Sequence, residues 1–580
     1  MIKVDKLSYS FPQKDLYNNI SFTLEEGKHC AFIGTNGSGK STLIDIIIDP
    51  EKYMFDGTLE MDPDLSIGYV SQFSQQGEIK EITVFEYIGE KFIKLQNEIT
   101  SICSEMETSS DIDSLLEKYQ QALDAFDVIN GDDFENIINK NLNLANLSKY
   151  KDQMLSELSG GEIKLIQVIK EMLNSPDLMI MDEPDVFLDF ENLNALKALI
   201  NSHKGTMLII THNRYLLNHC FNKILHLENM ELQEFDGNYI EYNFFLLQTK
   251  IELQELAAAD NEELERNEML IKKFRFQATE YNQSAKGKSL NARVKIQERL
   301  EKSRIKSPFV DIKQPNISLV ADNEMVETVV LKVNDYSASF DDMLLENVNF
   351  EIKSTDKVAI IGSNGAGKTT LLREIFKNNN ASIEINEDVE VAYLSQLQGK
   401  TLNESNTILE EFLDAGFKTN QEVREYISGY GFEEDINQKI GSLSGGEKNI
   451  LQLAKVSASK ANMLLLDEPT SHLDTYSQIA LEKAIENYKG AILMISHDFY
   501  SIVNCMDFVL MIEDKTIRKM SMRKFRKMIY ASHFDKDYLE IEQKKKLVET
   551  KIALALKDTD FTLAKDLSQE LEELIKLLQI

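Results

Sequence analysis

Short apolar runs occur along the chain, and each ends where glycine or acidic residues begin. The runs "HCAFI" at 29–33 and "KVAII" at 357–361 are each followed by a glycine-rich segment and then by an apolar helical pattern. "DLMIMDE" at 177–183 and "NMLLLDE" at 462–468 end in two carboxylates. Apolar runs of about four to eight residues are typical of buried strands. The pattern therefore predicts an α/β fold in which glycine-rich loops join strands to helices.

Two stripes of apolar residues between 92 and 126 have the spacing of helices. The stripes repeat every three or four residues and are separated by "ETSSD" at 107–111. Their members are Phe92, Leu95, Ile99, Ile102 and Met106 in the first, and Ile112, Leu116, Tyr119, Leu123 and Phe126 in the second. This predicts an antiparallel helical hairpin, an arm at about 85–135. The alternative is a helical pair that packs flat on the rest of the protein.

A second helical region covers 241–325. The 42 residues of 241–282 contain no proline or glycine, which predicts one long helix. Gly287 lies in a predicted turn, and a shorter helix then ends before Pro308. A helix of about 40 residues is about 60 Å long. Residues 537–580 predict a helical tail, with one stripe made by Leu567, Leu571, Leu574 and Leu578.

One set of motifs occurs twice in the same order. "GTNGSGKST" at 34–42 recurs as "GSNGAGKTT" at 362–370, and "LSGGE" occurs at 158–162 and 443–447. "DEP", the following "TH" or "SH", and "LSGGE" all recur with an offset of 285, whereas "SQ" recurs with an offset of 324. The chain is therefore two copies of one module. We place the first module at 1–240, the helical linker at 241–325, the second module at 326–530 and a helical extension at 531–580.

The glycine-rich segments have the strand–loop–helix setting of phosphate-binding loops. Backbone N–H groups of such a loop surround a β-phosphate, a lysine neutralises the β- and γ-oxygens, and a hydroxyl binds Mg²⁺. Lys40 and Lys368 would be the lysines, and Ser41 and Thr369 the hydroxyls. The predicted ATP-binding positions of the two loops are Gly34, Asn36, Gly37, Gly39, Lys40, Ser41 and Thr42, with Gly362, Asn364, Gly365, Gly367, Lys368, Thr369 and Thr370.

The carboxylate pairs that end the other two apolar runs suit phosphate hydrolysis. Asp182 and Asp467 would bind Mg²⁺, largely through water. Glu183 and Glu468 are placed to polarise the attacking water. Acidic residues can simply end a strand, but the repeated spacing to the neighbouring motifs favours the functional interpretation.

Composition limits what the protein can contact. The formal net charge is −33, which opposes non-specific binding to nucleic acid. No stretch of 18 apolar residues and no secretory signal is present, and the four cysteines have no metal-ligand spacing, so we expect a cytoplasmic protein without membrane spans. Residues 266–306 nevertheless carry 12 Lys or Arg against 4 Glu. A solvated helix face is the simplest explanation of such a run.

The combination of phosphate loop, "SQ", "LSGGE", "DEP" and "TH/SH" resembles the ATP-binding-cassette ATPases. In that family two cassettes close head to tail over two ATP molecules. The resemblance implies that Gln72 and Gln396 contact ATP and Mg²⁺, and that His212 and His497 act with the glutamates on the γ-phosphate. It also implies that each site takes its signature from the other module, Ser444, Gly445 and Gly446 at the first and Ser159, Gly160 and Gly161 at the second. Phe11 and Phe340 match the aromatic that stacks on adenine, although Tyr9 or Tyr336 could take this place.

The first module departs from the family pattern after its carboxylate pair. The second module reads "DEPTSHLD", but the first reads "DEPDVFLD", with Asp185, Val186 and Phe187 in place of the usual residues. This segment approaches the ATP of the partner module in the family. Since both carboxylate pairs are present, we expect two competent sites with unequal rates.

The arm and the long linker together resemble the F-type ATP-binding-cassette proteins, which bind the E site of the ribosome. Their linker points towards the P-site tRNA and the peptidyl-transferase centre. This resemblance implies a 70S ribosome with its 23S rRNA and P-site tRNA as partners of a monomer, with no membrane. A basic linker tip on an acidic body suits an RNA-walled channel. The contacts we expect are Lys272, Lys273, Arg275, Lys286, Lys288, Arg293 and Lys295.

The short arm, the long linker and "DEPDVFLDFENLN" resemble the antibiotic-resistance branch, which protects ribosomes from drugs. The implied drugs are lincosamides, pleuromutilins and streptogramin A. A housekeeping translation factor is the alternative. A transporter ATPase subunit and a DNA-repair ATPase are less favoured, because the chain lacks membrane domains, very long coiled coils and zinc-binding cysteines.

Overall fold

The computed structural model of the chain divides into two units. The first comprises Met1–Asp236 with Gln314–Lys527, and the second Gly237–Lys313 with Met528–Ile580. The structure describes all residues except 12–13, 72–80, 108–111, 130, 187, 282–308, 310–314, 322–327, 340–342, 396–401, 433–435, 531–535 and 579–580. Only the backbone is described at 128, 260–268, 270–281, 529–530, 536–540 and 542–543.

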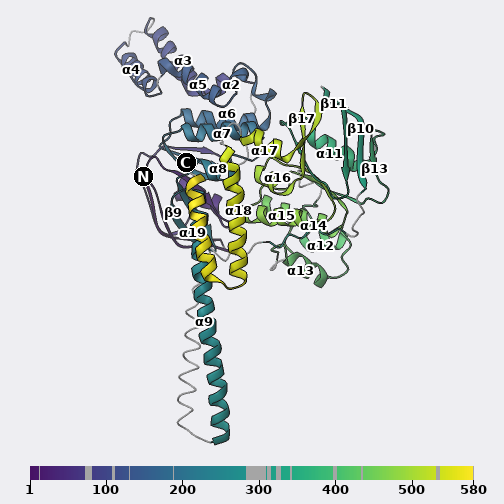
Figure 1. The fold of residues 1–580 in the computed structure, drawn as a ribbon. Coiled ribbons are helices and arrows are strands. Elements are labelled where there is room, and N and C mark those ends of the chain that lie inside the picture. The colour runs from purple at the N-terminus through teal and green to yellow at the C-terminus, as the bar shows by residue number, and fades with distance from the viewer. Residues whose placement is uncertain are drawn as a thin grey trace. The chain divides into compact units, whose positions relative to one another are not determined.

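The first module contains two sheets (Figure 1). A three-stranded antiparallel sheet has the order β2 (Lys14–Leu24), β1 (Ile2–Phe11), β4 (Asp56–Met61). The six-stranded sheet has the order β5 (Ile67–Val70), β6 (Leu178–Asp182), β7 (Thr206–Ile210), β3 (His29–Ile33), β8 (Lys223–Glu228), β9 (Glu231–Asp236). Only the edge strand β9 runs antiparallel to its neighbour there. The apolar runs of the sequence form its central strands, as a sheet covered on both faces requires.

The order of the central strands explains how motifs far apart in sequence meet. β6, β7 and β3 are parallel neighbours, so their carboxyl ends lie on one edge of the sheet. The phosphate loop follows β3, Asp182 ends β6, and His212 follows β7. In open α/β sheets this edge is where ligands bind. Besides the helical pair described below, the described helices of the module include α1 (Lys40–Ile48), α2 (Val84–Ile88), α5 (Phe134–Leu144), α6 (Gly160–Leu173), α7 (Phe190–Ser202) and α8 (Arg214–His219).

The second module repeats this arrangement. Its antiparallel sheet has the order β11 (Met343–Lys353), β10 (Val329–Ser339), β13 (Ile383–Ile385). The larger sheet has the order β14 (Val391–Leu394), β15 (Met463–Asp467), β16 (Ala491–Ile495), β12 (Lys357–Ile361), β17 (Phe508–Glu513), β18 (Thr516–Ser521). Its helices are α11 (Lys368–Lys377), α12 (Ile408–Asp414), α13 (Asn420–Ser428), α14 (Gly445–Ala458), α15 (Thr475–Asn487), α16 (Phe499–Cys505) and α17 (Met522–Tyr530). The α/β class with two tandem modules is confirmed.

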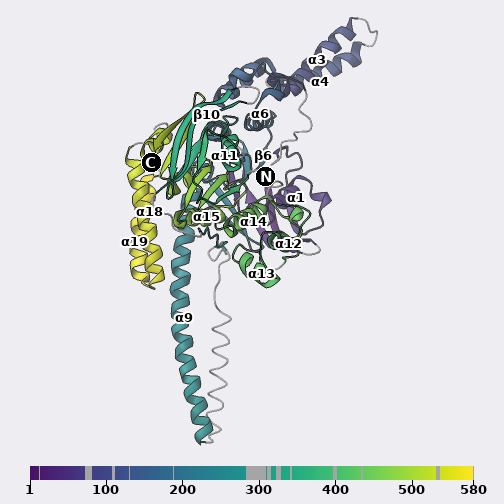
Figure 2. The ribbon, with the colours of Figure 1, turned by 90° about the vertical axis from the view of Figure 1, so that its right-hand side faces the viewer.

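The extra residues of the first module form a helical pair, α3 (Glu90–Met106) and α4 (Ile112–Val128). Figures 1 and 2 both show the pair projecting away from the sheets rather than lying flat on them. One expectation was wrong in detail, because Leu116 is 50% exposed and Ile112 51% exposed. On α4, Leu115 and Ala122 are buried with Ile102 of α3, while the predicted Tyr119 also packs against this cluster, so the packed face differs from the predicted stripe only in part. A short hairpin buries one narrow stripe, so a neighbouring apolar residue is left in solvent.

In its described residues the second unit contains the helices α9 (Tyr239–Tyr281), α18 (Lys536–Lys557) and α19 (Phe561–Leu578). α9 is a single helix of 43 residues, in agreement with the uninterrupted sequence pattern (Figures 1 and 2). Ile251 of α9 packs in one apolar cluster with Ile552 of α18 and with Leu571 and Ile575 of α19. The predicted turn and the returning limb of the linker lie outside the described residues.

Across the described parts of the chain, no helix combines the length and the apolar character needed to cross a membrane.

Candidate functional site

Each glycine-rich loop encloses the side chain of its lysine. Lys40 Nζ donates to the carbonyl oxygens of Gly34 and Thr35 at 2.9 and 3.0 Å, and Lys368 Nζ donates to those of Gly362 and Ser363, both at 2.8 Å. Both lysines are buried. Burial lowers the pKa of each, and the charge of Glu183 or Glu468 opposes this shift. A buried cation held by neutral carbonyls is suited to receive an anionic phosphate.

The two modules meet through their phosphate loops. The backbone N–H of Asn36 donates to Asp474 Oδ2 of the second module at 3.1 Å, and that of Asn364 donates to Asp189 Oδ2 of the first module at the same distance. These two contacts are equivalent under the internal repeat. Asn36 Nδ2 also donates to the carbonyl oxygen of His472 at 2.7 Å. Each phosphate loop is therefore completed by residues of the other module.

The two signature segments begin helices that lie beside the opposite loops. Ser159 and Ser444 are the N-caps of α6 and α14, and each forms a capping box with the glutamate three residues later. A Cβ atom at Gly446 would lie only 1.9 Å from Asn36 Nδ2 and 2.6 Å from the carbonyl oxygen of His472. Glycine is therefore required at Gly446 for this close approach. Helix N-termini with unpaired N–H groups are favourable positions for phosphate.

A cavity of about 500 Å³ lies between the modules in this first unit. Its walls include Ser159, Gly160 and Gly161 from the first module and Lys368, Thr369, Glu468 and His497 from the second. Glu183, His212 and His472 also line it. The structure thus brings the phosphate loop of one module and the signature of the other to one cavity.

The carboxylate pairs lie at the ends of β6 and β15. Asp182 and Asp467 are buried, and burial next to the following glutamate raises the pKa of both, to about 6 for Asp182. Glu183 and Glu468 have φ angles of 45° and 52°, in the left-handed region that non-glycine residues rarely adopt. Such strained positions cluster at functional sites. The repeated strain marks both glutamates as candidates for chemistry.

The two glutamates have different neighbours. Glu183 Oε2 lies 3.6 Å from His472 Nδ1 of the second module. Burial opposes ionisation of Glu183, but the His472 contact and the positive charges nearby hold its pKa below the usual value. Glu468 lies 3.4 Å from His497 Nε2 of its own module, and burial raises its pKa to about 7 against the opposing charge of Lys368. Under the repeat, Phe187 occupies the position of His472, and a phenylalanine ring cannot donate a hydrogen bond.

Both histidines after the central strand lie beside the lysines. Burial lowers the pKa of His212 to about 4 and that of His497 to about 3, and Lys40 or Lys368 adds to the shift. Both imidazoles are therefore neutral near pH 7. A neutral imidazole can donate one hydrogen bond to a phosphate oxygen without adding a charge.

The hydroxyl of each phosphate loop faces the strand-end aspartate. Thr369 Oγ1 donates to Asp467 Oδ1 at 3.0 Å, and the Ser41 side chain opposes the rise in the pKa of Asp182 that burial causes. Among the described residues no cluster of three or more His, Cys, Asp or Glu side chains could hold a metal ion. One hydroxyl and one carboxylate are the protein ligands that Mg²⁺ needs when phosphates complete its shell, so the donor set fits Mg²⁺.

Other predicted residues are placed as follows. Phe11 ends β1, is 44% exposed and packs edge-on against Tyr9 at 5.3 Å. Tyr336 is buried in the core of the second module, so it offers no surface for stacking. Lys272, Lys273 and Arg275 lie on α9, where only the backbone is described. The predicted residues outside the described parts of the chain are Gln72, Gln396, Phe340, Lys286, Lys288, Arg293 and Lys295.

Comparison with known proteins agrees with this geometry. A family model described as ABC transporter matches residues 17–186 and 345–471. The Escherichia coli K12 protein named energy-dependent translational throttle protein EttA is 30% identical over 520 residues, which cover 87% of this chain and 90% of EttA. The chain belongs to the F-type branch of the ATP-binding-cassette family (ABC-F). This ABC-F protein binds and hydrolyses ATP.

Two further matches cover most of this ABC-F protein. ABC transporter F family member 2 of Arabidopsis thaliana is 28% identical over 541 residues, which cover 88% of this chain and 76% of the relative. A crystal structure of archaeal ribosome recycling factor aABCE1 in complex with archaeal ribosomal stalk protein aP1 has a TM-score of 0.54 at 18% identity. That match covers 91% of this chain and 92% of the other. At this identity the structural match shows the fold alone.

Sequence reasoning missed several site residues of this ABC-F protein. Asp189 and Asp474 bond the opposite phosphate loops, and His472 contacts Glu183. The signal for the aspartates was present, since "LD" recurs at an offset of 285 after both carboxylate pairs. Glu228, which accepts from Thr35 N and Oγ1 at 3.2 and 3.0 Å, has no comparable sequence signal.

Proposed function

We propose that this ABC-F protein is an ATP-dependent translation factor that binds the E site of the 70S ribosome in its ATP-bound form. The observation that carries the proposal is the direct continuity of the nucleotide-binding module with a long, basic-ended helix. β9 of the first module ends at Asp236 and α9 begins at Tyr239. The name of EttA, a translational throttle protein with which this chain shares 30% identity, supports a role in translation.

Charge supports RNA as the partner of the linker. The chain carries a formal net charge of −33, yet residues 266–306 carry 12 Lys or Arg against 4 Glu. A local basic segment on an acidic protein binds phosphate backbones only where it is positioned against them. Lys272, Lys273, Arg275, Lys286, Lys288, Arg293 and Lys295 are the proposed contacts with 23S rRNA and the P-site tRNA.

The proposed chemistry follows from the geometry of the two ATP sites. Lys40 and Lys368 would bind β- and γ-phosphate oxygens. Ser41 and Thr369, together with Asp182 and Asp467, would hold Mg²⁺, which would neutralise part of the phosphate charge. Gln72 and Gln396 are proposed to join these ligands, and Phe11 and Phe340 to stack on adenine. The signature residues Ser444, Gly445 and Gly446, or Ser159, Gly160 and Gly161, complete the site from the opposite module.

Hydrolysis is a single displacement at the γ-phosphorus. A water oxygen bonds to that phosphorus as the bond to the β,γ-bridging oxygen breaks, which yields ADP and inorganic phosphate. Glu183 or Glu468 orients the water and accepts its proton, while His212 or His497 donates a hydrogen bond to the γ-phosphate. In the proposed cycle ATP binding favours the closed pair of modules, and hydrolysis releases the protein from the ribosome.

The test is ribosome binding by a variant that cannot hydrolyse ATP. The Glu183→Gln/Glu468→Gln variant with ATP is expected to co-sediment with 70S ribosomes in a sucrose gradient. The matched control, Lys40→Ala/Lys368→Ala, should remain at the top because its loops lack the phosphate-binding charge. If the glutamine variant also remains unbound with ATP, the proposal is wrong.

Protection of ribosomes from antibiotics is a second candidate, favoured by the "DEPDVF" segment. Asp185 occupies the position of Thr470 under the repeat and accepts a hydrogen bond from Thr211 Oγ1 at 2.7 Å, so the first module provides a partner for this changed residue. Expression in a drug-sensitive bacterium, with lincosamide, pleuromutilin and streptogramin A drugs, tests this role. Raised resistance that disappears when 278–290 is replaced by a Gly-Ser loop, with ATPase activity retained, would support it over a housekeeping role.

A further inference from the structure

One face of α15 in the second module contacts the first module at three successive helical turns. Asp474, Gln478 and Glu482 are spaced four residues apart, so they lie on the same side of the helix. Asp474 Oδ2 accepts from the backbone N–H of Asn36, and Gln478 Nε2 donates to the carbonyl oxygen of His212 at 3.4 Å. Glu482 pairs with Arg214. A single helix face therefore touches the phosphate loop, the histidine and the residue two places after that histidine.

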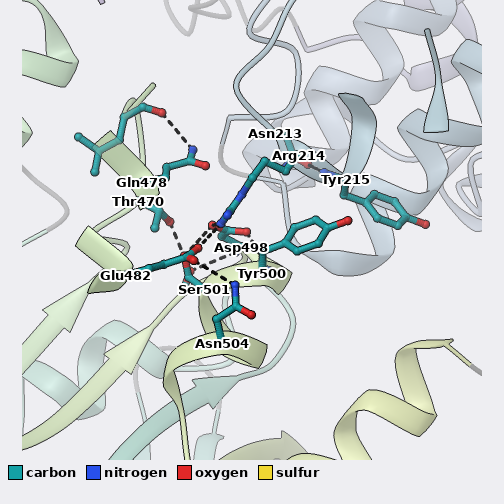
Figure 3. Close-up of polar contacts among 12 residues, drawn as sticks. Asn213, Arg214, Tyr215, Thr470, Gln478, Glu482, Asp498, Tyr500, Ser501 and Asn504 are labelled. Carbon is teal, nitrogen blue, oxygen red and sulfur yellow. Dashed lines mark hydrogen bonds and ion pairs between the residues drawn. The ribbon is translucent and has the colours of Figure 1, made fainter. Parts of the chain in front are cut away.

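The last of these contacts is a buried ion cluster (Figure 3). Arg214 Nη2 donates to Glu482 Oε1, and also to Asp498 Oδ2 at 2.9 Å. The side chains of Arg214, Glu482 and Asp498 are only 12%, 10% and 16% exposed. Asp498 is the N-cap of α16 and directly follows His497. The arginine thus joins the histidine segment of one module to the histidine segment of the other.

Further hydrogen bonds hold both carboxylates in position. Ser501 Oγ lies 3.1 Å from Glu482 Oε1 and 2.7 Å from Asp498 Oδ2, and Asn504 Nδ2 donates to Glu482 Oε2 at 3.0 Å. The guanidinium carbon of Arg214 lies 5.0 Å from the centre of the Tyr500 ring. Burial is unfavourable for the guanidinium charge, but the two carboxylates outweigh it and raise the pKa of Arg214. Loss of the arginine would leave two buried carboxylates facing each other without their cation.

The opposite side of the module pair has different chemistry. Under the offset of 285, Phe499 corresponds to Arg214, Lys197 to Glu482 and Asn213 to Asp498. Phe499 is 6% exposed and packs against Phe525, whereas Lys197 Nζ donates to Tyr215 Oη of its own module at 3.1 Å. An equivalent ion pair is chemically impossible with phenylalanine at this position. The ion cluster at Arg214 therefore has no counterpart at Phe499, Lys197 and Asn213.

We propose that Arg214 is a positioning residue that couples the two ATP sites by tying the His212 segment of the first module to the His497 segment of the second. A shift of either histidine segment must either carry the other with it or break a buried ion cluster. The phosphate loop at Asn36 follows through Asp474 on the same helix. This inference rests on the proposed roles of Glu183 and Glu468 in hydrolysis, and it does not depend on the ribosome.

The test is a double-mutant cycle on ATP turnover of the full chain. Glu468→Gln is made in the wild-type chain and in an Arg214→Met chain, and the factor by which it lowers turnover is compared. If the sites are coupled, Glu468→Gln in the wild-type chain removes more ATP turnover than the second site contributes, because the first site slows as well. In the Arg214→Met chain, Glu468→Gln should remove only the ATP turnover that the second site contributes. If Arg214→Met only damages the structure, Glu468→Gln should lower ATP turnover by the same factor in both chains.

The controls distinguish the possible failures. Arg518 is 71% exposed in its ion pair with Glu513, so in an Arg518→Met chain Glu468→Gln should lower turnover by the same factor as in wild type. In an Arg214→Lys chain this factor should lie between those of the wild-type and Arg214→Met chains. Glu482→Gln removes one charge with little change of shape and replaces Arg214→Met if that variant does not fold. Equal factors in the two backgrounds would overturn the coupling. Unchanged turnover of Glu468→Gln in the wild-type chain would overturn the catalytic role, and the coupling with it.

Discussion

His472 Nδ1 of the second module lies 3.6 Å from Glu183 Oε2 of the first, so the water-polarising carboxylate proposed for one site is contacted from the other module. The residue that corresponds to His472 in the sequence repeat is Phe187, whose side chain has no polar atom. Two sites with the same motifs thus differ at the group that matters most for hydrolysis.

The variants Glu183→Gln and Glu468→Gln should keep unequal ATPase activities. Removal of a general base costs about 10²–10⁴-fold at its own site, so the residual activity of each variant comes from the other site. Steady-state phosphate release under saturating ATP measures both. Matching residual rates would show that the two sites are equivalent despite their different neighbours.

The contact with His472 can be tested directly. In the Glu468→Gln chain the first site carries the remaining ATP turnover. Adding His472→Phe to this chain should bring its ATPase rate closer to the rate of the Glu183→Gln chain. The change gives the first site the residue type that the second site has. The same substitution in the Glu183→Gln chain is the control and should have little effect. An effect of equal size in both chains would point to general damage of the module contact.

Gly446 should tolerate alanine far less well than Gly161. A Cβ at Gly446 would lie 2.6 Å from the backbone oxygen of His472, whereas at Gly161 the nearest atoms belong to the side chains of Asn192 and Leu188, at 3.0 and 3.3 Å. Side chains can shift by a few tenths of an ångström more easily than backbone. We expect Gly446→Ala to lower ATP turnover at least as far as Glu183→Gln does, and Gly161→Ala to lower it less. Comparable losses would contradict the close approach of the second signature to Asn36.

Some of these site residues could be predicted from the sequence and others could not. The loops at Lys40 and Lys368 and the carboxylates at the strand ends were predictable, because each depends on local pattern and recurs with a constant offset. Asp474 could have been predicted for the same reason. Arg214 could not be predicted, because its partners Glu482 and Asp498 are more than 260 residues away and the equivalent residue in the repeat is Phe499. The burial of Leu115 on α4 was missed because the adjacent Leu116 is equally apolar, and only packing determines which of the two is buried.

The first unit should lose stability as the pH falls, in part through His226. This imidazole is fully buried on β8, where burial lowers its pKa below the usual 6.5; Glu228 opposes that shift and Lys40 adds to it. The unfolded chain takes up the proton near pH 6.5 while the folded chain resists it, so stability is complete above that pH and declines below it. His226→Asn should therefore narrow the difference between unfolding temperatures at pH 7.5 and pH 5.5. Calorimetry is suitable, since the chain has no tryptophan. If the difference between the two unfolding temperatures is unchanged in His226→Asn, groups other than His226 cause the loss of stability at low pH.

Leu571 should be a main contributor to the stability of the second unit. Its side chain is 1% exposed in the cluster that joins α9, α18 and α19. Leucine-to-alanine changes in such cores cost about 2–5 kcal/mol, because they lose apolar burial and leave a cavity. Leu571→Ala should therefore reduce hydrogen-exchange protection in both α18 and α19. Leu577→Ala is the matched control on the same helix, since Leu577 is 54% exposed. ATP turnover should be unchanged in both variants because the described site residues belong to the first unit. Equal loss of protection in the two variants would mean that α19 is not held by this cluster.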